Sequence, residues 1–176
     1  MNLRIVFLIT IVSSVLVLGG CTQPTSTGTN TNDKPAALKA GPLPNEGFKA
    51  EVTAAEPPAK LRAGQVDVIN IKVKNTSTAI WWPAGGETTD RPDNTFYIAA
   101  GNRWLDKDGK RTSETEGHAG ITKVIRPGES IDMQLQVTAP KTPGDWTMEL
   151  DMVQEGVAWF SEKGSPTTKL KVTVVK

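Results

Sequence analysis

The sequence predicts an all-β domain built as an antiparallel β-sandwich, and three observations lead to this fold class. Residues 129–160 contain two runs in which apolar and polar side chains alternate strictly. The apolar positions are Ile131, Met133, Leu135 and Val137 in the first run and Trp146, Met148, Leu150 and Met152 in the second. A period of two indicates half-buried strands, with one face on a core and the other in water. The corner between the runs is rich in Pro and Gly, and no segment shows the 3.6-residue period of an amphipathic helix.

The strands expected before this pair follow in chain order. Residues 48–54 predict a first strand, and residues 65–74 predict a stronger one in which the apolar phase shifts between Val68 and Ile69. That shift indicates a β-bulge or a stretch buried on both faces. Residues 95–105 predict the next strand, and the Asp108-Gly109 pair after it favours a tight hairpin turn.

The remaining elements complete the sandwich. Residues 110–120 are polar and are expected to form a loop, residues 121–125 a short strand, and residues 170–174 a closing strand. Lys169, Lys171 and Lys176 fall on the polar face of that last strand, where charge protects a sheet edge from pairing. About seven to nine strands with turns every ~8–12 residues is the pattern of a β-sandwich.

Residues 1–20 have the pattern of a signal peptide. Arg4 precedes an apolar stretch from Ile5 to Leu18, which is shorter than the ~20 residues of an ordinary transmembrane helix. Leu18-Gly19-Gly20-Cys21 resembles the bacterial lipobox, which implies that Cys21 is diacylated and becomes the mature N-terminus. A simple secretory signal or a short N-terminal anchor is the alternative. Thr22 follows in place of the aspartate that retains lipoproteins in the inner membrane, so the outer membrane is favoured if the source is Gram-negative.

We expect Cys21→Ser to release the protein from the membrane fraction or to leave it as an uncleaved precursor. Each buried acyl methylene contributes ~0.8 kcal/mol, so two or three chains anchor a protein stably where one does not. Membrane fractionation measures the effect. Mass spectrometry that found an unmodified Cys21 in membrane-bound mature protein would contradict the assignment.

The chain after the signal peptide divides into a tether and one domain. Residues 21–45 contain the lipidated cysteine and a segment rich in Thr, Asn, Pro and Gly, which cannot bury enough apolar surface to offset its ordering entropy. Residues 46–176 form the sandwich. Once Arg4 is removed, 19 basic residues face 19 acidic ones, and this balance argues against nucleic acid as a partner. Cys21 is the only cysteine, so the mature domain has no disulfide.

A series of short segments in the domain resembles a known class of modules. In chain order the segments are Val73-Lys74-Asn75-Thr76, Trp82-Pro83, Trp104-Leu105-Asp106 with Asp108-Gly109, Arg126-Pro127-Gly128-Glu129, Thr138-Ala139-Pro140, Pro143-Gly144-Asp145-Trp146 and residues 153–160. The series resembles the small immunoglobulin-like β-sandwich modules of bacterial envelope proteins, including those appended to glycosyltransferases. The resemblance covers about residues 45–176 and implies the fold, but it transfers no catalytic residue.

Catalytic and metal sites find little support in the composition. His118 is the only histidine and is expected to be a solvated loop residue, so a hydrolytic triad and a zinc site both lack their partners. Asp106 and Asp108 could bind Ca²⁺, but a hairpin turn capped by its own aspartates is favoured. Glu149 and Asp151 could form a paired-carboxylate glycosidase site, but a solvated strand face is favoured. No cofactor and no metal site are expected.

The tryptophans are the best signal for a binding surface. Trp146 is expected in the core with its apolar neighbours. Trp81 and Trp82 are adjacent in an extended stretch and should point to opposite faces. We predict that Trp82 lies inward and that Trp81 is an exposed contact residue, with Arg91 and Asp93 as polar partners on the same loop.

Trp159 is the second candidate contact, because Trp159 and Phe160 should also point to opposite faces. The alternative, that loops cover both members of each pair, stays open. The leading hypothesis is a non-enzymatic, membrane-anchored lipoprotein whose immunoglobulin-like domain binds a partner protein or an envelope glycan. A structural spacer or assembly module of the cell envelope is the second hypothesis, and a carboxylate-based hydrolase is the third.

Overall fold

The computed structural model describes residues 41–84 and 96–176. These described residues belong to one compact unit. The predicted signal peptide, Cys21, most of the predicted tether, Arg91 and Asp93 lie outside the described residues. Within the described ranges, no helix has the length and apolar character needed to cross a membrane.

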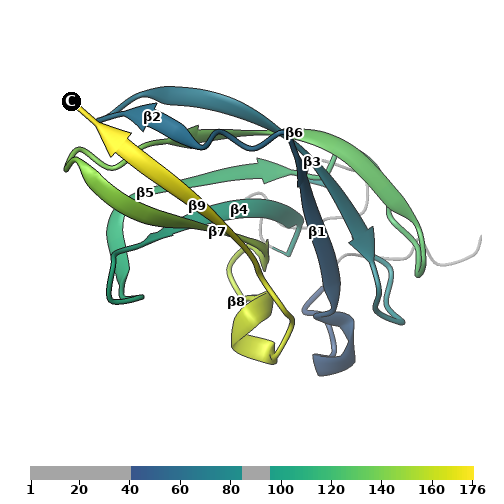
Figure 1. Ribbon diagram of the computed structural model, residues 1–176. Helices are drawn as coiled ribbons and strands as arrows, with labels where there is room; N and C mark the ends of the chain where they lie inside the picture. The colour runs from purple at the N-terminus through teal and green to yellow at the C-terminus, as the bar shows by residue number, and fades with distance from the viewer. Residues whose placement is uncertain (1–40, 85–95) are drawn as a thin grey trace, which may run out of the picture. The chain divides into compact units, whose positions relative to one another are not determined.

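The described residues form nine strands and two short 3₁₀ helices (Figure 1). In chain order they are η1 (Asn45–Gly47), β1 (Ala50–Ala55), β2 (Lys60–Arg62), β3 (Val66–Asn75), β4 (Ile98–Leu105), β5 (Arg111–Gly120), β6 (Ser130–Thr138), β7 (Gly144–Gln154), β8 (Ala158–Trp159), η2 (Phe160–Lys163) and β9 (Thr168–Val175).

The strands make two sheets with the strand order of an immunoglobulin-like sandwich. One sheet has three strands in the order β1-β3-β6, and the other has six in the order β2-β9-β7-β4-β5, with β8 paired to β7. All pairings are antiparallel except that of β2 with β9. The first four strands thus alternate between the sheets, whereas β4 and β5, and later β7, β8 and β9, follow one another within the larger sheet. The predicted fold class is confirmed.

The core fills the space between the sheets with the residues that the alternation predicts. Ile131, Leu135 and Val137 of β6 and Met148, Leu150 and Met152 of β7 are buried. β3 contributes Ile69, Ile71 and Val73, while Val66 and Val68 are 56% and 50% exposed. The register of β3 with β6 runs without a break, so the bulge or two-sided burial predicted near Val68 was wrong. The two valines simply belong to the outward face.

The polar stretch before residue 121 also differs from its prediction. Residues 111–120 form the strand β5 and not a loop, because their backbone pairs with β4. Gly117 allows β5 to approach β6 closely: a Cβ there would overlap the carbonyl oxygen of Gln136. The short strand expected at residues 121–125 reduces to a single bridge between Ile125 and Trp81.

Candidate functional site

The outer face of β4 and β7 is covered, and this cover defines the site. Every residue of β4 is buried, as are residues 147–154 of β7, although alternate side chains of both strands point away from the core. β8 pairs with the end of β7, and η2 follows it directly. Figure 1 shows this segment near the end of β7 where the turn folds back. The segment thereby encloses charged side chains of the sheet.

A buried arginine is the centre of this charged cluster. Arg103 on β4 is 2% exposed. Its Nη2 lies 2.7 Å from Oδ2 of Asp151 and 3.4 Å from Oε2 of Glu149, two carboxylates on the neighbouring strand. The same nitrogen donates to Oγ of Ser161 at 2.9 Å. The guanidinium therefore ties the covering segment to the sheet.

Trp159 lies over this guanidinium. Cζ of Arg103 is 4.1 Å from the ring centroid of Trp159, within the range of a cation–π contact. Gly101 makes room for the ring, since a Cβ on that residue would lie 2.7 Å from Cη2 of Trp159. The His118 ring meets Trp159 edge-on, with centroids 5.1 Å apart. Glu162 accepts the backbone N–H of Trp159 at 3.2 Å. The indole is thus fixed from several sides while remaining half-buried.

Burial dominates the electrostatics of the central ion pair. It raises the pKa of the Asp151 carboxyl above its ordinary value, while hydrogen bonds from Ser161 and Met152 and the charge of Arg103 oppose that rise. Burial also lowers the pKa of the Arg103 guanidinium, against the raising effect of Asp151 and Glu149. An arginine remains protonated even so. Burial therefore disfavours the charged form of each partner, and the charge of each favours the charged form of the other.

Glu149 completes the cluster through three further groups. Its Oε1 accepts a hydrogen bond from Thr167 at 2.9 Å and lies 3.9 Å from Nζ of Lys169. Its Oε2 lies 3.4 Å from Nη2 of Arg111. Among the described residues, neither this oxygen nor Nε of Arg103 has a hydrogen-bond partner. A partly satisfied buried network of this kind is sensitive to the loss of any member.

Glu149 and Asp151 do not form the solvated strand face that the sequence predicted. They are 5% and 2% exposed, because β8 and η2 fold over the outward side of β7. Cations or hydroxyls hold both carboxylates, so neither is placed as a free acid or base. Arg103, Arg111 and Ser161 were missed by the sequence analysis; the only signal was that Arg103 interrupts the apolar residues of its strand.

The Asp106 and Asp108 pair forms the capped turn that was favoured over a calcium site. Oδ1 of Asp106 accepts the backbone N–H groups of Asp108 and Lys110, both at 2.9 Å. Asp108 pairs with Lys107 in water. Across residues 41–84 and 96–176, no group of three or more His, Cys, Asp and Glu side chains could hold a metal ion. His118 lies in the strand β5 and not in a loop, but it is exposed as expected; its Nδ1 lies 2.7 Å from Oε1 of Glu155.

The assignment of Trp81 as an exposed contact was wrong. Trp81 is 0% exposed, and Trp82 is the half-buried member of the pair. The Trp81 indole N–H donates to the carbonyl of Gly47 at 3.1 Å, and its ring meets Phe160 edge-on at 5.2 Å. Trp146 packs against the core but is only partly buried, because it lies near the open end of β7. Trp159 keeps its place as a candidate contact.

The comparisons with known proteins concern the fold. No known protein family matches this chain, and no curated protein does. The chain is similar to a β-glucosidase from Listeria innocua in complex with glucose, at 10% identity and a TM-score of 0.40, over 73% of this chain and 16% of that one. It is similar to the CARDB domain of PF1109 from Pyrococcus furiosus, at 14% identity and a TM-score of 0.35, over 72% and 93%.

A third similar structure is Spo0M, a sporulation control protein from Bacillus subtilis, at 14% identity and a TM-score of 0.35, over 73% of this chain and 49% of that one. The chain thus spans only a small part of the β-glucosidase and about half of Spo0M. Similarity at this level gives no information on activity. The two sheets and their strand order define the described part of the chain as an immunoglobulin-like β-sandwich.

Proposed function

We propose that this protein is a lipid-anchored, non-enzymatic module of a bacterial cell envelope that binds a partner protein through the surface around Trp159. The lipobox resemblance at Cys21 supports the anchor. The immunoglobulin-like fold supports a module that acts by contact. The carboxylates Glu149 and Asp151 are bound within the chain, which favours binding over hydrolysis.

The observation that carries the proposal is the fixed, half-buried indole of Trp159. Tryptophan and arginine carry much of the binding energy at protein interfaces, and they do so best when they are held rigid before binding. Arg103 and Gly101 fix the Trp159 ring from below, so little conformational entropy is lost when a partner covers it. The outer side of the sandwich thereby carries a preformed aromatic anchor.

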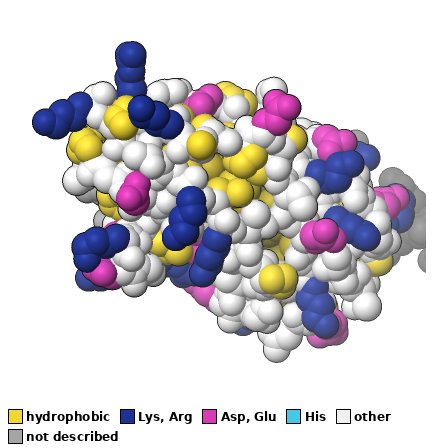
Figure 2. Space-filling model, viewed as in Figure 1, with side chains coloured by type: hydrophobic (Ala, Val, Ile, Leu, Met, Phe, Trp, Pro, Cys, Tyr) yellow, Lys and Arg dark blue, Asp and Glu magenta, His cyan; other side chains and the backbone are white. Residues whose placement is uncertain are grey.

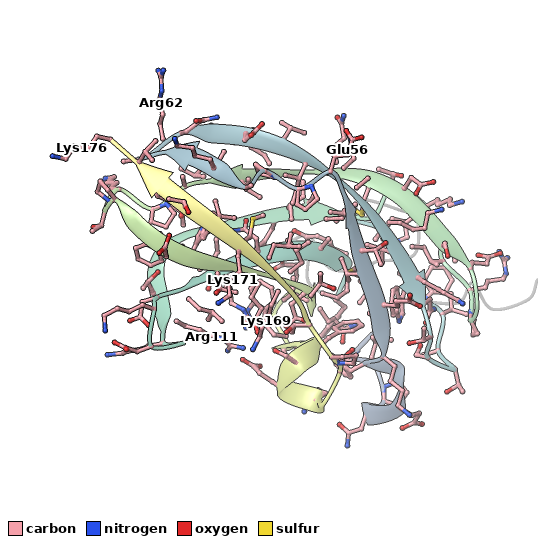
Figure 3. The ribbon with its side chains drawn as sticks, in the orientation of Figure 1. Glu56, Arg62, Arg111, Lys169, Lys171 and Lys176 are labelled. Carbon is pink, nitrogen blue, oxygen red and sulfur yellow. The ribbon has the colours of Figure 1, made fainter. Side chains whose placement is uncertain are left out.

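Exposed cations lie on the same side of the sheet. Arg111 comes from β5, and Lys169 and Lys171 come from β9 (Figure 3). Arg111 and Lys169 approach Glu149, and Lys171 donates to Oγ1 of Thr147 at 3.0 Å. Figure 2 shows Lys and Arg interspersed with Asp and Glu over the visible face. Glu149 is buried beneath these cations, so the charge that reaches the surface here is positive. The three cations therefore favour a partner that presents carboxylates.

Photo-crosslinking in cells tests this surface with a matched pair of exposed valines. Val157 lies two residues from Trp159 and is 40% exposed, whereas Val66 is 56% exposed on the other sheet. A crosslinking amino acid at position 157 should give one stoichiometric adduct with a second protein, and the same residue at position 66 should give none. Trp159→Ala should weaken binding of the purified partner about 30-fold, the effect of an interface hot spot. Arg111→Ala should weaken it less and reduce its salt dependence.

The melting temperature of each variant serves as the control, since Trp159 also covers Arg103. Equal crosslinking from both valines would contradict the proposal. So would unchanged partner binding by a folded Trp159→Ala variant. An adduct of the protein with itself would favour the structural spacer instead.

A further inference from the structure

We infer a second binding site, for a neutral sugar ring, in a groove at one end of the sandwich. The groove lies between the β4–β5 turn and the β6–β7 connection and has a volume of about 390 Å³. Its lining includes Asp106, Lys107, Thr142, Pro143, Asp145 and Trp146. Small-molecule sites have volumes of ~300–1,000 Å³. The groove lies near the lower limit of this range, which suits a ligand of one or two sugar rings.

Trp146 gives the groove a fixed aromatic wall. Its strand, β7, holds it in register with Val172, and its indole N–H donates to the carbonyl of Thr142 at 3.0 Å. One side of the side chain packs against the core, and the remainder lines the groove. An aromatic face with one polar edge already satisfied binds the apolar face of a pyranose at little conformational cost.

Two carboxylates supply the polar contacts that a sugar needs. Oδ1 of Asp106 is occupied by the backbone of its own turn, and Oδ1 of Asp145 accepts the Thr173 hydroxyl at 3.0 Å. Each bond orients its carboxylate. In the part of the chain that the structure describes, the Oδ2 atom of each aspartate has no hydrogen-bond donor. Hydroxyl groups donate well to such oxygens, since charge-assisted hydrogen bonds are the strong ones.

The charge of the groove selects the kind of sugar. Among the described residues that line the groove, Lys107 is the only cation, and its Nζ lies 2.8 Å from each carboxylate oxygen of Asp108. The groove therefore presents uncompensated carboxylates from Asp106 and Asp145. A phosphorylated or carboxylated sugar would be repelled, whereas neutral hexoses and N-acetylhexosamines would not. This site is separate from the Trp159 surface and does not depend on the function proposed for that surface.

Titration of the purified full-length protein with defined sugars tests the groove. The probes are cellotetraose and chitotetraose, with inorganic phosphate and trigalacturonic acid as anionic comparisons. Both neutral probes, or one of them, should bind with a Kd between about 10 μM and 10 mM, read by calorimetry and by tryptophan fluorescence. The anionic probes should not bind. Trp146→Ala should weaken binding at least about tenfold, and Asp145→Asn should weaken it about tenfold.

Two controls keep the result interpretable. Trp82→Ala removes another half-buried tryptophan, outside the groove lining, and should leave sugar binding unchanged. If Trp146→Ala fails to fold, the exposed Asp145→Asn variant still decides the question. The proposal is overturned if neither neutral probe binds at about 10 mM. It is also overturned if the folded variants bind as the wild type does. Crosslinking from position 157 should be unaffected by Asp145→Asn, so the two proposals fail separately.

Discussion

Trp81→Ala should lower the free energy of unfolding by about 3–5 kcal/mol, a large part of the ~5–15 kcal/mol of an ordinary domain. Trp81 is fully buried. Its ring packs edge-on against Phe160, which packs in turn against Phe48, and its backbone forms a bridge with Ile125. Its removal leaves a cavity and deprives the Gly47 carbonyl of its donor. Urea unfolding followed by circular dichroism measures the loss.

The neighbouring residue gives the matched control. Trp82→Ala removes the same side chain from a half-buried position and should cost clearly less. Trp81→Phe should fall between the wild type and Trp81→Ala, because it keeps an aromatic ring against Phe160. Equal losses of stability in Trp81→Ala and Trp82→Ala would contradict the prediction, because the loss would then not follow the difference in burial between the two residues.

The strands that the sequence predicted best are those with one apolar and one polar face. β6 and β7 were found because Ile131, Leu135, Met148 and Leu150 repeat at a period of two. β5 was missed because its residues carry no apolar period. β5 is held by its backbone pairing with β4, and Gly117, which has no side chain, lets it approach β6 closely. Neither feature depends on hydrophobicity. Backbone pairing of this kind leaves little trace in a sequence.

The tryptophan pair shows why side-chain orientation was harder to predict than strand position. Opposite directions for Trp81 and Trp82 followed from extended geometry. Which one lies inward depends on the bridge to Ile125 and on the rings of Phe48 and Phe160. Those partners lie more than thirty residues away in the sequence, so local pattern could not select between the two orientations.

The charge cluster could not be predicted because it depends on strand register. Arg103 stands opposite Glu149 across the β4–β7 ladder, and Asp151 stands opposite Gly101. Neither pairing can be derived from the spacing of these residues along the chain. The cover from β8 and η2 then turned an outward, polar-looking face into a buried one. Alternation predicts which side a residue faces, but not whether that side is later covered.

Arg103→Met should destabilise the protein by about 3–5 kcal/mol at neutral pH, because it leaves the Asp151 carboxylate buried without its cation. Methionine fills much of the volume of the arginine stem, so the loss reports mainly on charge. Arg111→Met removes a guanidinium that also approaches Glu149 but is 46% exposed. That control should cost about 1 kcal/mol or less.

The loss in Arg103→Met should shrink as the pH falls towards 4. Burial already holds the pKa of Asp151 above its ordinary value, and Arg103 is one of the groups that lower it. Without Arg103 the folded-state pKa rises further. When a carboxyl group has a higher pKa in the folded protein than in the unfolded chain, the folded protein loses stability as the pH rises. The loss runs from the unfolded-state pKa, about 3.9, through the folded-state pKa. Acid therefore restores stability by neutralising the buried charge.

Unfolding of the double variant Arg103→Met/Asp151→Asn isolates that charge. It should be more stable than Arg103→Met at pH 7 and should lack the extra pH dependence, because no buried carboxylate remains at position 151. A loss in Arg103→Met that stays constant between pH 4 and pH 7 would contradict this account. The destabilisation would then come from lost packing against Trp159 and Ser161, and the buried ion pair would not be what holds the covering segment on the sheet.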